Sequence, residues 1–66
     1  MFVTVNGQPR EVPDGLNIAT LVDELGFAGK RVAIELNGQI VPRSRHQDTK
    51  VAPADQIEIV VAVGGG

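Results

Sequence analysis

The chain has 66 residues, a formal net charge of −2 at pH 7, and no cysteine, tryptophan or tyrosine. A chain of this length forms one small domain, and without cysteine neither disulfides nor a thiolate metal site can stabilise it. Its weak negative charge gives no electrostatic basis for binding nucleic acid, and its apolar runs are far shorter than the roughly 20 residues that span a bilayer. Because the N-terminus also lacks the pattern of a signal peptide, we expect a cytoplasmic protein without a membrane or nucleic-acid partner.

The first twelve residues predict a β-hairpin. Residues 2–5 alternate in the manner of a strand. Asn6-Gly7 is typical of a type I′ turn, which needs a positive φ at both central positions. Residues 8–12 then return antiparallel, and Pro9 indicates an edge strand because proline cannot donate to a sheet ladder.

A short helix follows a turn at residues 13–15. Its apolar stripe at i, i+3, i+4 and i+7 consists of Ile18, Leu21, Val22 and Leu25. Asn17 is the predicted N-cap, and Gly26 stands where a glycine ends a helix. A helix of eight or nine residues is not stable alone, so we expect it to pack on a sheet.

The second half of the chain predicts three more strands. Residues 32–36 alternate, Asn37-Gly38 forms a second hairpin turn, and residues 39–41 return. A polar loop precedes the last strand at residues 56–61. One helix and a mixed sheet of about five strands give a two-layer α+β domain over residues 1–66.

The last strand has one apolar face and one mixed face. Ile57, Ile59 and Val61 point towards the core or its margin, which leaves Glu58 and Val60 outward. Phe2 and Ile40 are predicted to point the same way. Together with Ala62 and Val63 in the tail, these exposed apolar side chains form a candidate partner surface, although scattered surface apolar residues are also normal.

Three glycines, Gly64, Gly65 and Gly66, end the chain directly after this strand. Glycine has the most slender and permissive backbone, so residues 62–66 form a flexible tail that could enter a narrow active site. Its reactive group is the α-carboxylate of Gly66, which is ionised at pH 7 and must be activated, for instance as an anhydride with AMP. The chain is then a substrate and not an enzyme, and it needs no cofactor of its own. The simpler interpretation is a frayed terminus, which the strand just before the glycines disfavours.

Two other groups of residues were candidates for a site. His46 is the single histidine, and it stands in a polar loop without the partners that catalysis or metal binding requires, so we predict an exposed surface histidine. Lys30 with Arg31, and Arg43 with Arg45, form two short basic clusters. For these, a solvated surface and the docking of an acidic partner both stay open.

Five motifs in order carry a resemblance to a known family. They are Phe-Val-Thr-Val-Asn-Gly at the start, Pro-Asp-Gly before the helix, Val-Ala-Ile-Glu-Leu-Asn-Gly in the middle, Val-Pro-Arg-Ser after it and Val-Gly-Gly-Gly at the end. In this order the chain resembles, over essentially its whole length, the sulfur carrier (ThiS) family of thiamin biosynthesis. The resemblance implies the ubiquitin-like β-grasp fold, in which the first and last strands pair in parallel.

The resemblance also implies a function for the tail. An E1-like enzyme would adenylate Gly66 with ATP, and a persulfide donor of the cysteine desulfurase or rhodanese type would supply sulfur for a thiocarboxylate. That thiocarboxylate would give its sulfur to thiazole synthase. Gly64 departs from the common Gly-Gly ending by adding a third glycine, which leaves the reactive end unchanged.

Three alternatives stay open. A related carrier for molybdopterin, cysteine or tRNA thiolation would share the glycine end and differ in its partner surface. A non-catalytic β-grasp interaction module would not need Gly66 at all. A protein modifier would become attached to lysine side chains of other proteins.

Overall fold

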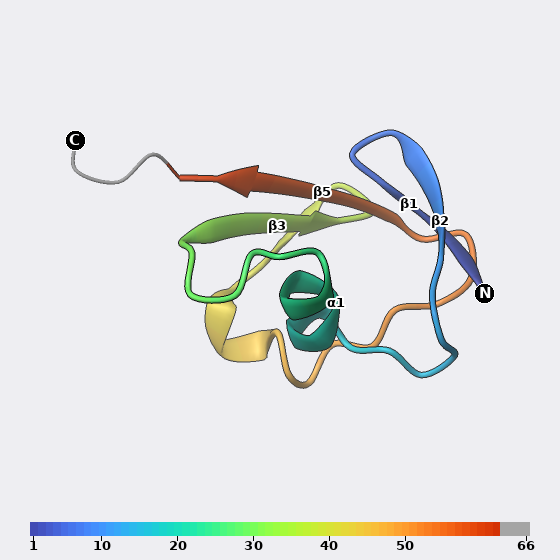
Figure 1. The fold of residues 1–66 in the computed structure, drawn as a ribbon, viewed down its shortest axis with the longest axis horizontal. Coiled ribbons are helices and arrows are strands. Elements are labelled where there is room, and N and C mark those ends of the chain that lie inside the picture. Colours follow the sequence, from blue (N-terminus) through green and yellow to red (C-terminus); the bar gives the residue numbers. More distant parts are fainter. Residues whose placement is uncertain (63–66) are drawn as a thin grey trace.

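The computed structural model describes residues 1–62 as one mixed sheet with a helix packed on one face (Figure 1). In chain order the elements are β1 (Phe2–Val5), β2 (Gln8–Glu11), α1 (Ile18–Glu24), β3 (Val32–Leu36), β4 (Gln39–Val41), the 3₁₀ helix η1 (Arg43–Arg45) and β5 (Gln56–Val61). The strand order is β2-β1-β5-β3-β4. The predicted sheet of five strands and single main helix is confirmed, and so is the edge position of the strand that contains Pro9.

The centre of the sheet is the last strand in the sequence. β5 pairs in parallel with β1, through Thr4–Gln56 and Val5–Ile57. On its other side it pairs antiparallel with β3 along its length, from Leu36–Ile57 to Val32–Val61. β5 is therefore held by β1 at its start, whereas β3 alone pairs with it up to Val61, where the chain leaves the sheet.

Both Asn-Gly turns adopt the predicted left-handed conformation. The φ angles are 51° and 82° at Asn6 and Gly7, and 52° and 85° at Asn37 and Gly38. Positive φ at both central residues is the requirement of a type I′ hairpin, so these two predictions are confirmed.

Helix α1 is stabilised at both ends by hydrogen bonds that the sequence indicated. The side chain of Asn17 accepts a hydrogen bond from the Thr20 amide at 2.7 Å, which is the predicted N-cap. At the other end Gly26 has a φ of 88°, and its amide donates to the Asp23 carbonyl. The Phe27 amide donates to the carbonyl of Val22 at 3.0 Å, which completes a Schellman motif. This motif turns the chain sharply and places Phe27 beside the helix.

The core lies between α1 and the inner face of the sheet. Ile18 and Leu21 of the helix are almost fully buried, as are Val3, Ile34 and Ile57 of the three central strands. Burying each such aliphatic side chain stabilises the fold by about 1.5–3 kcal/mol, and aliphatic residues alone supply this core. In residues 1–62 no helix has the length and apolar character needed to cross a membrane.

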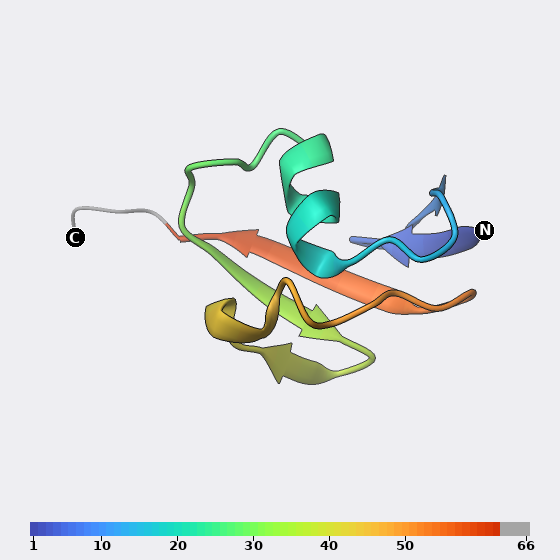
Figure 2. The same cartoon turned by 90° about the horizontal axis from the view of Figure 1, so that it is seen from below.

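The loop between β4 and β5 packs against the first turn of helix α1. Figure 2 shows α1 and η1 on the same side of the sheet. The Ile18 amide donates to the carbonyl of Thr49, and the Ala19 amide donates to the carbonyl of His46. These bonds satisfy amides of the first helical turn that have no partner within the helix.

Candidate functional site

The candidate reactive end of the chain begins where β5 stops. The Ala62 amide donates to the carbonyl of Arg31 at 2.8 Å, so the first residue of the predicted tail is still hydrogen-bonded to the body of the protein. Val63, Gly64, Gly65 and Gly66 lie outside the described residues. The assignment of Gly66 as the reactive residue therefore stays a prediction from sequence.

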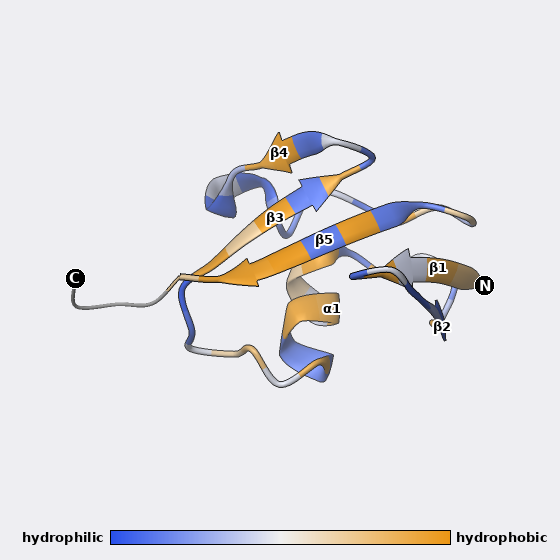
Figure 3. Ribbon diagram, turned by 90° about the horizontal axis from the view of Figure 1, so that it is seen from above, coloured by the Kyte–Doolittle hydropathy of each residue, from blue (hydrophilic) through white to orange (hydrophobic). Residues whose placement is uncertain are grey.

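The proposed partner residues lie on the sheet face opposite α1. The exposed fractions of Phe2, Ile40 and Val60 are 61, 66 and 61%. Figure 3 looks onto this face, with α1 behind the sheet. The predicted outward direction of these three side chains is confirmed.

The strand register separates these residues into different regions. Val60 stands opposite Ala33 near the end of β5, next to the root of the tail. Ile40 is opposite Glu35 on the edge strand β4. Phe2 precedes Thr4, which is opposite Gln56 at the start of β5, so Phe2 lies at the far end of the sheet from Val60. These three side chains share a face but form no single patch beside the tail.

His46 is buried, so the prediction of an exposed surface histidine is wrong. Only 8% of the residue is accessible, and its Nε2 is 3.0 Å from the carbonyl oxygen of Val41. Its own carbonyl accepts the Ala19 amide. The polar sequence around His46 suggested a solvated loop, but the loop folds under α1, and local composition carries no signal of that contact.

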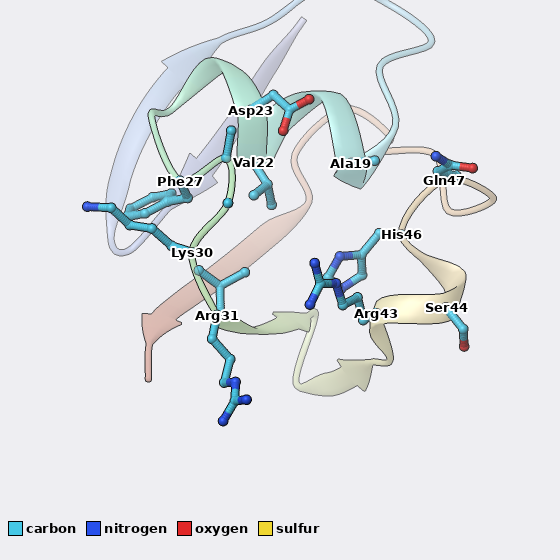
Figure 4. A pocket seen from close by; sticks show the side chains of 13 residues that line it. Ala19, Val22, Asp23, Phe27, Lys30, Arg31, Arg43, Ser44, His46 and Gln47 are labelled. Carbon is cyan, nitrogen blue, oxygen red and sulfur yellow. The ribbon is translucent and has the colours of Figure 1, made fainter. Parts of the chain in front are cut away.

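The two basic clusters meet at one pocket on the helix side of the sheet. Lys30 and Arg31 line it from the loop after α1, and Arg43 lines it from η1. In Figure 4 the charged ends of Lys30 and Arg31 extend outward from the rim of the pocket, and Arg43 lies beside His46. Arg45 does not line it. Within residues 1–62 no group of three histidine, aspartate or glutamate side chains is placed to hold a metal ion.

Comparison with known proteins identifies the family. The model of the ThiS family matches residues 3–66. The chain belongs to the ThiS family. The earlier resemblance is thereby confirmed, and it now rests on a match through the last glycine. Members of this family are sulfur carriers of thiamin biosynthesis, and a carrier is acted on by enzymes without being one.

A solved structure shows the same fold. The crystal structure of a thiamine biosynthesis protein (ThiS) from Geobacter metallireducens superposes with a TM-score of 0.86, at 36% identity and over the whole of both chains. The ubiquitin-like β-grasp fold that the sequence predicted is therefore confirmed.

Segments similar to this chain occur in curated relatives of two different lengths. A protein named thiazole synthase from Paramagnetospirillum magneticum is 36% identical over 66 residues, and this chain spans only 20% of its length. An uncharacterised protein, ycf40, from Porphyra purpurea is 33% identical over 97% of this chain and 90% of its own. The segment thus occurs both as part of a much longer protein and as most of a small one.

Proposed function

We propose that this protein carries sulfur on the carboxylate of Gly66 for the formation of the thiamin thiazole. The observation that carries the proposal is the family match through residue 66, which includes the terminal glycines. The structure adds support, because β5 is the central strand of the sheet and β3 pairs with it up to Val61, next to the root of the tail.

The first step is activation by an E1-like enzyme. The carboxylate of Gly66 attacks the α-phosphate of ATP, which forms an acyl adenylate and releases pyrophosphate. The carboxylate is a poor electrophile because it is ionised at neutral pH, and the adenylate converts its oxygen into part of a good leaving group. Residues 63–66 can span at most about 13–14 Å, which sets how deeply the carboxylate can enter that enzyme.

The second step introduces sulfur. The terminal sulfur of a persulfide attacks the acyl adenylate, AMP leaves, and an acyl disulfide joins the carrier to the donor. A thiol then attacks the donor-side sulfur, which releases a thiocarboxylate on Gly66 and leaves a disulfide on the donor. The donor is a cysteine desulfurase or a rhodanese type of protein.

The third step is delivery to thiazole synthase. Proteins that bear this name contain a segment that is 36% identical to the whole of this chain. A carrier segment and a synthase in one polypeptide are kept at high effective concentration, which supports their joint action. We infer that the separate chain binds the equivalent enzyme as a partner.

The partner surface is proposed to centre on Val60. It is exposed, opposite Ala33 and within two residues of Ala62, so a protein that encloses the tail (from Val63 onward) would also cover it. Ile40 on the same face, and Phe2 at its far end, extend the candidate surface.

The test is the chemical product. The intact protein is incubated with ATP, the adenylating enzyme and a persulfide donor, and its mass is measured. One oxygen should be exchanged for one sulfur, and an alkylating reagent should trap the thiocarboxylate at Gly66. A protein that gains no sulfur, or that gains it elsewhere than Gly66, would favour a β-grasp interaction module.

A further inference from the structure

A pocket of about 400 Å³ lies between the loop after α1 and η1, on the opposite side of the sheet from Val60. Its polar or charged lining residues include Asp23, Lys30, Arg31, Arg43, His46 and Gln47. Figure 4 shows Lys30 and Arg31 on one side of the pocket and Arg43 and His46 on the other. The strands β3 and β4 separate these two groups in the sequence, and the fold brings them together.

The pocket is positively charged although the chain is acidic. Three cationic side chains and one carboxylate, that of Asp23, line it and leave an excess of two positive charges, whereas the whole chain carries −2. Across residues 1–62 the one ion pair within 4 Å joins the N-terminal amine to Asp14. Among residues 1–62 no carboxylate therefore forms an ion pair with Lys30, Arg31 or Arg43, and these cations can attract an external acidic group.

Apolar residues form part of the same pocket. Val22, Phe27 and Val32 line it, and the Schellman motif holds Phe27 next to Val22 through the amide–carbonyl bond at 3.0 Å. A charge beside low-dielectric side chains interacts more strongly with its partner than a fully solvated one. A pocket lined by both cationic and apolar side chains is complementary to an acidic side chain, whose carboxylate is carried on a short aliphatic stem.

The pocket adjoins the root of the tail. Arg31 lines the pocket, and its carbonyl oxygen accepts the Ala62 amide at 2.8 Å. In Figure 4 the end of β5 lies beside Arg31. A protein that receives the tail would therefore have its surface close to Arg31, at the rim of this pocket.

We propose that this basic pocket docks acidic side chains at the entrance of the adenylating enzyme's tail-binding site. The proposal rests on the proposed function, since it names how the tail's recipient is recognised. Positive charges close to the tail would steer the chain so that Gly66 arrives first, because complementary charge raises association rates and sets orientation. The carboxylates of Asp23 and of Glu24 next to it make an extended polyanion such as nucleic acid a poorer occupant.

The test compares two charge-matched double variants of the full chain. Arg31→Glu with Arg43→Glu reverses two charges at the pocket, and Arg10→Glu with Lys50→Glu reverses two exposed charges that do not line it. Each protein is titrated into the adenylating enzyme, and ATP–pyrophosphate exchange gives kcat and KM at low and high salt. Circular dichroism checks that all three proteins fold.

The pocket variant should raise KM on the order of tenfold with kcat unchanged, and its KM should lose most of its salt dependence. The control should stay within about twofold of the unaltered protein. Equal effects of both variants would overturn the proposal and leave the sulfur-carrier function intact. Failure of the unaltered protein to be activated at all would overturn both.

A second readout identifies the occupant. In NMR titrations without ATP, the enzyme should shift the amide signals of Lys30, Arg31 and Arg43. If inorganic phosphate or a single-stranded oligonucleotide shifts the same signals at lower concentration than the enzyme does, the pocket binds phosphate groups and the proposal is wrong.

Discussion

Asn6 makes two hydrogen bonds to the backbone of Ile59, which is 53 residues away in the sequence. Its Oδ1 accepts the Ile59 amide at 2.7 Å, and its Nδ2 donates to the Ile59 carbonyl at 3.2 Å. The backbone pairing of β1 with β5 stops at Val5–Ile57. Where the backbone of β1 turns away, the side chain of Asn6 continues the hydrogen bonding between the two strands. It thereby holds β5 in place three residues before Ala62.

The two hydrogen bonds from Asn6 to Ile59 should make a measurable contribution to the free energy of unfolding. Asn6→Gly retains the positive φ and removes both side-chain bonds, so we expect a loss of about 1–3 kcal/mol from the unpaired groups of Ile59. Asn6→Ala should cost about 1–2 kcal/mol more, because alanine is strained at a φ of 51°. Urea unfolding of the three proteins gives both differences. A glycine variant as stable as the unaltered protein would show that water replaces the amide.

The inner face of β5 should carry a large share of the stability. Ile59 is 5% exposed and belongs to the same core as Leu21. Ile59→Ala should therefore cost about 2–5 kcal/mol, through lost burial and the cavity left behind. Thermal melting measures this, and an unchanged melting temperature would contradict the assignment of Ile59 to the core.

Two acidic side chains oppose each other on the outer face. Glu35 and Glu58 are cross-strand partners in the antiparallel β3–β5 pair, and like charges in this arrangement destabilise a sheet. Glu58→Gln should stabilise the fold by about 0.2–1 kcal/mol, and the gain should shrink as salt screens the charges. Glu24→Gln on the exposed side of α1 is the control, for which urea unfolding should show a smaller change.

The outer face offers a matched test of the partner surface. Val60→Asp should leave the melting temperature nearly unchanged, since the side chain is 61% exposed, yet weaken binding to the adenylating enzyme. Phe2→Asp changes an equally exposed side chain at the other end of the sheet. If calorimetry finds that both variants bind the adenylating enzyme equally weakly, Phe2 also belongs to the partner surface. Unaltered binding of the Val60 variant would place docking elsewhere.

The position of the terminal carboxylate should be decisive for activation. Removing Gly65 and Gly66 should abolish AMP incorporation and leave the fold unchanged, because no core residue is lost. Adding one alanine after Gly66 should do the same, since it moves the carboxylate and introduces a side chain. Radiolabelled ATP measures the product. Activation of the shortened chain at the rate of the intact one would exclude Gly66 as the acceptor.

Features that depend only on neighbouring residues could be predicted from the sequence. The Asn-Gly turns, the Asn17 cap, the Gly26 stop and the alternation of β5 all follow from local backbone and side-chain preferences. The turns, the cap and the helix end appear in the structure as predicted. In β5 the alternation holds through Val60, whereas Val61, predicted at the core or its margin, is 40% exposed. The order of the motifs also indicated the family, and the family implied the parallel β1–β5 pair.

Tertiary structure alone decided which distant residues meet. The burial of His46 depends on a loop folding under α1, and the two bonds from Asn6 to Ile59 depend on β1 lying beside β5. The register separates Phe2 from Val60, although alternation placed both on one face. The convergence of Lys30, Arg31 and Arg43 around one pocket is likewise set by the path of the chain through β3 and β4. Periodicity reports which side of an element a residue faces, whereas these contacts depend on how elements far apart in the sequence are packed together.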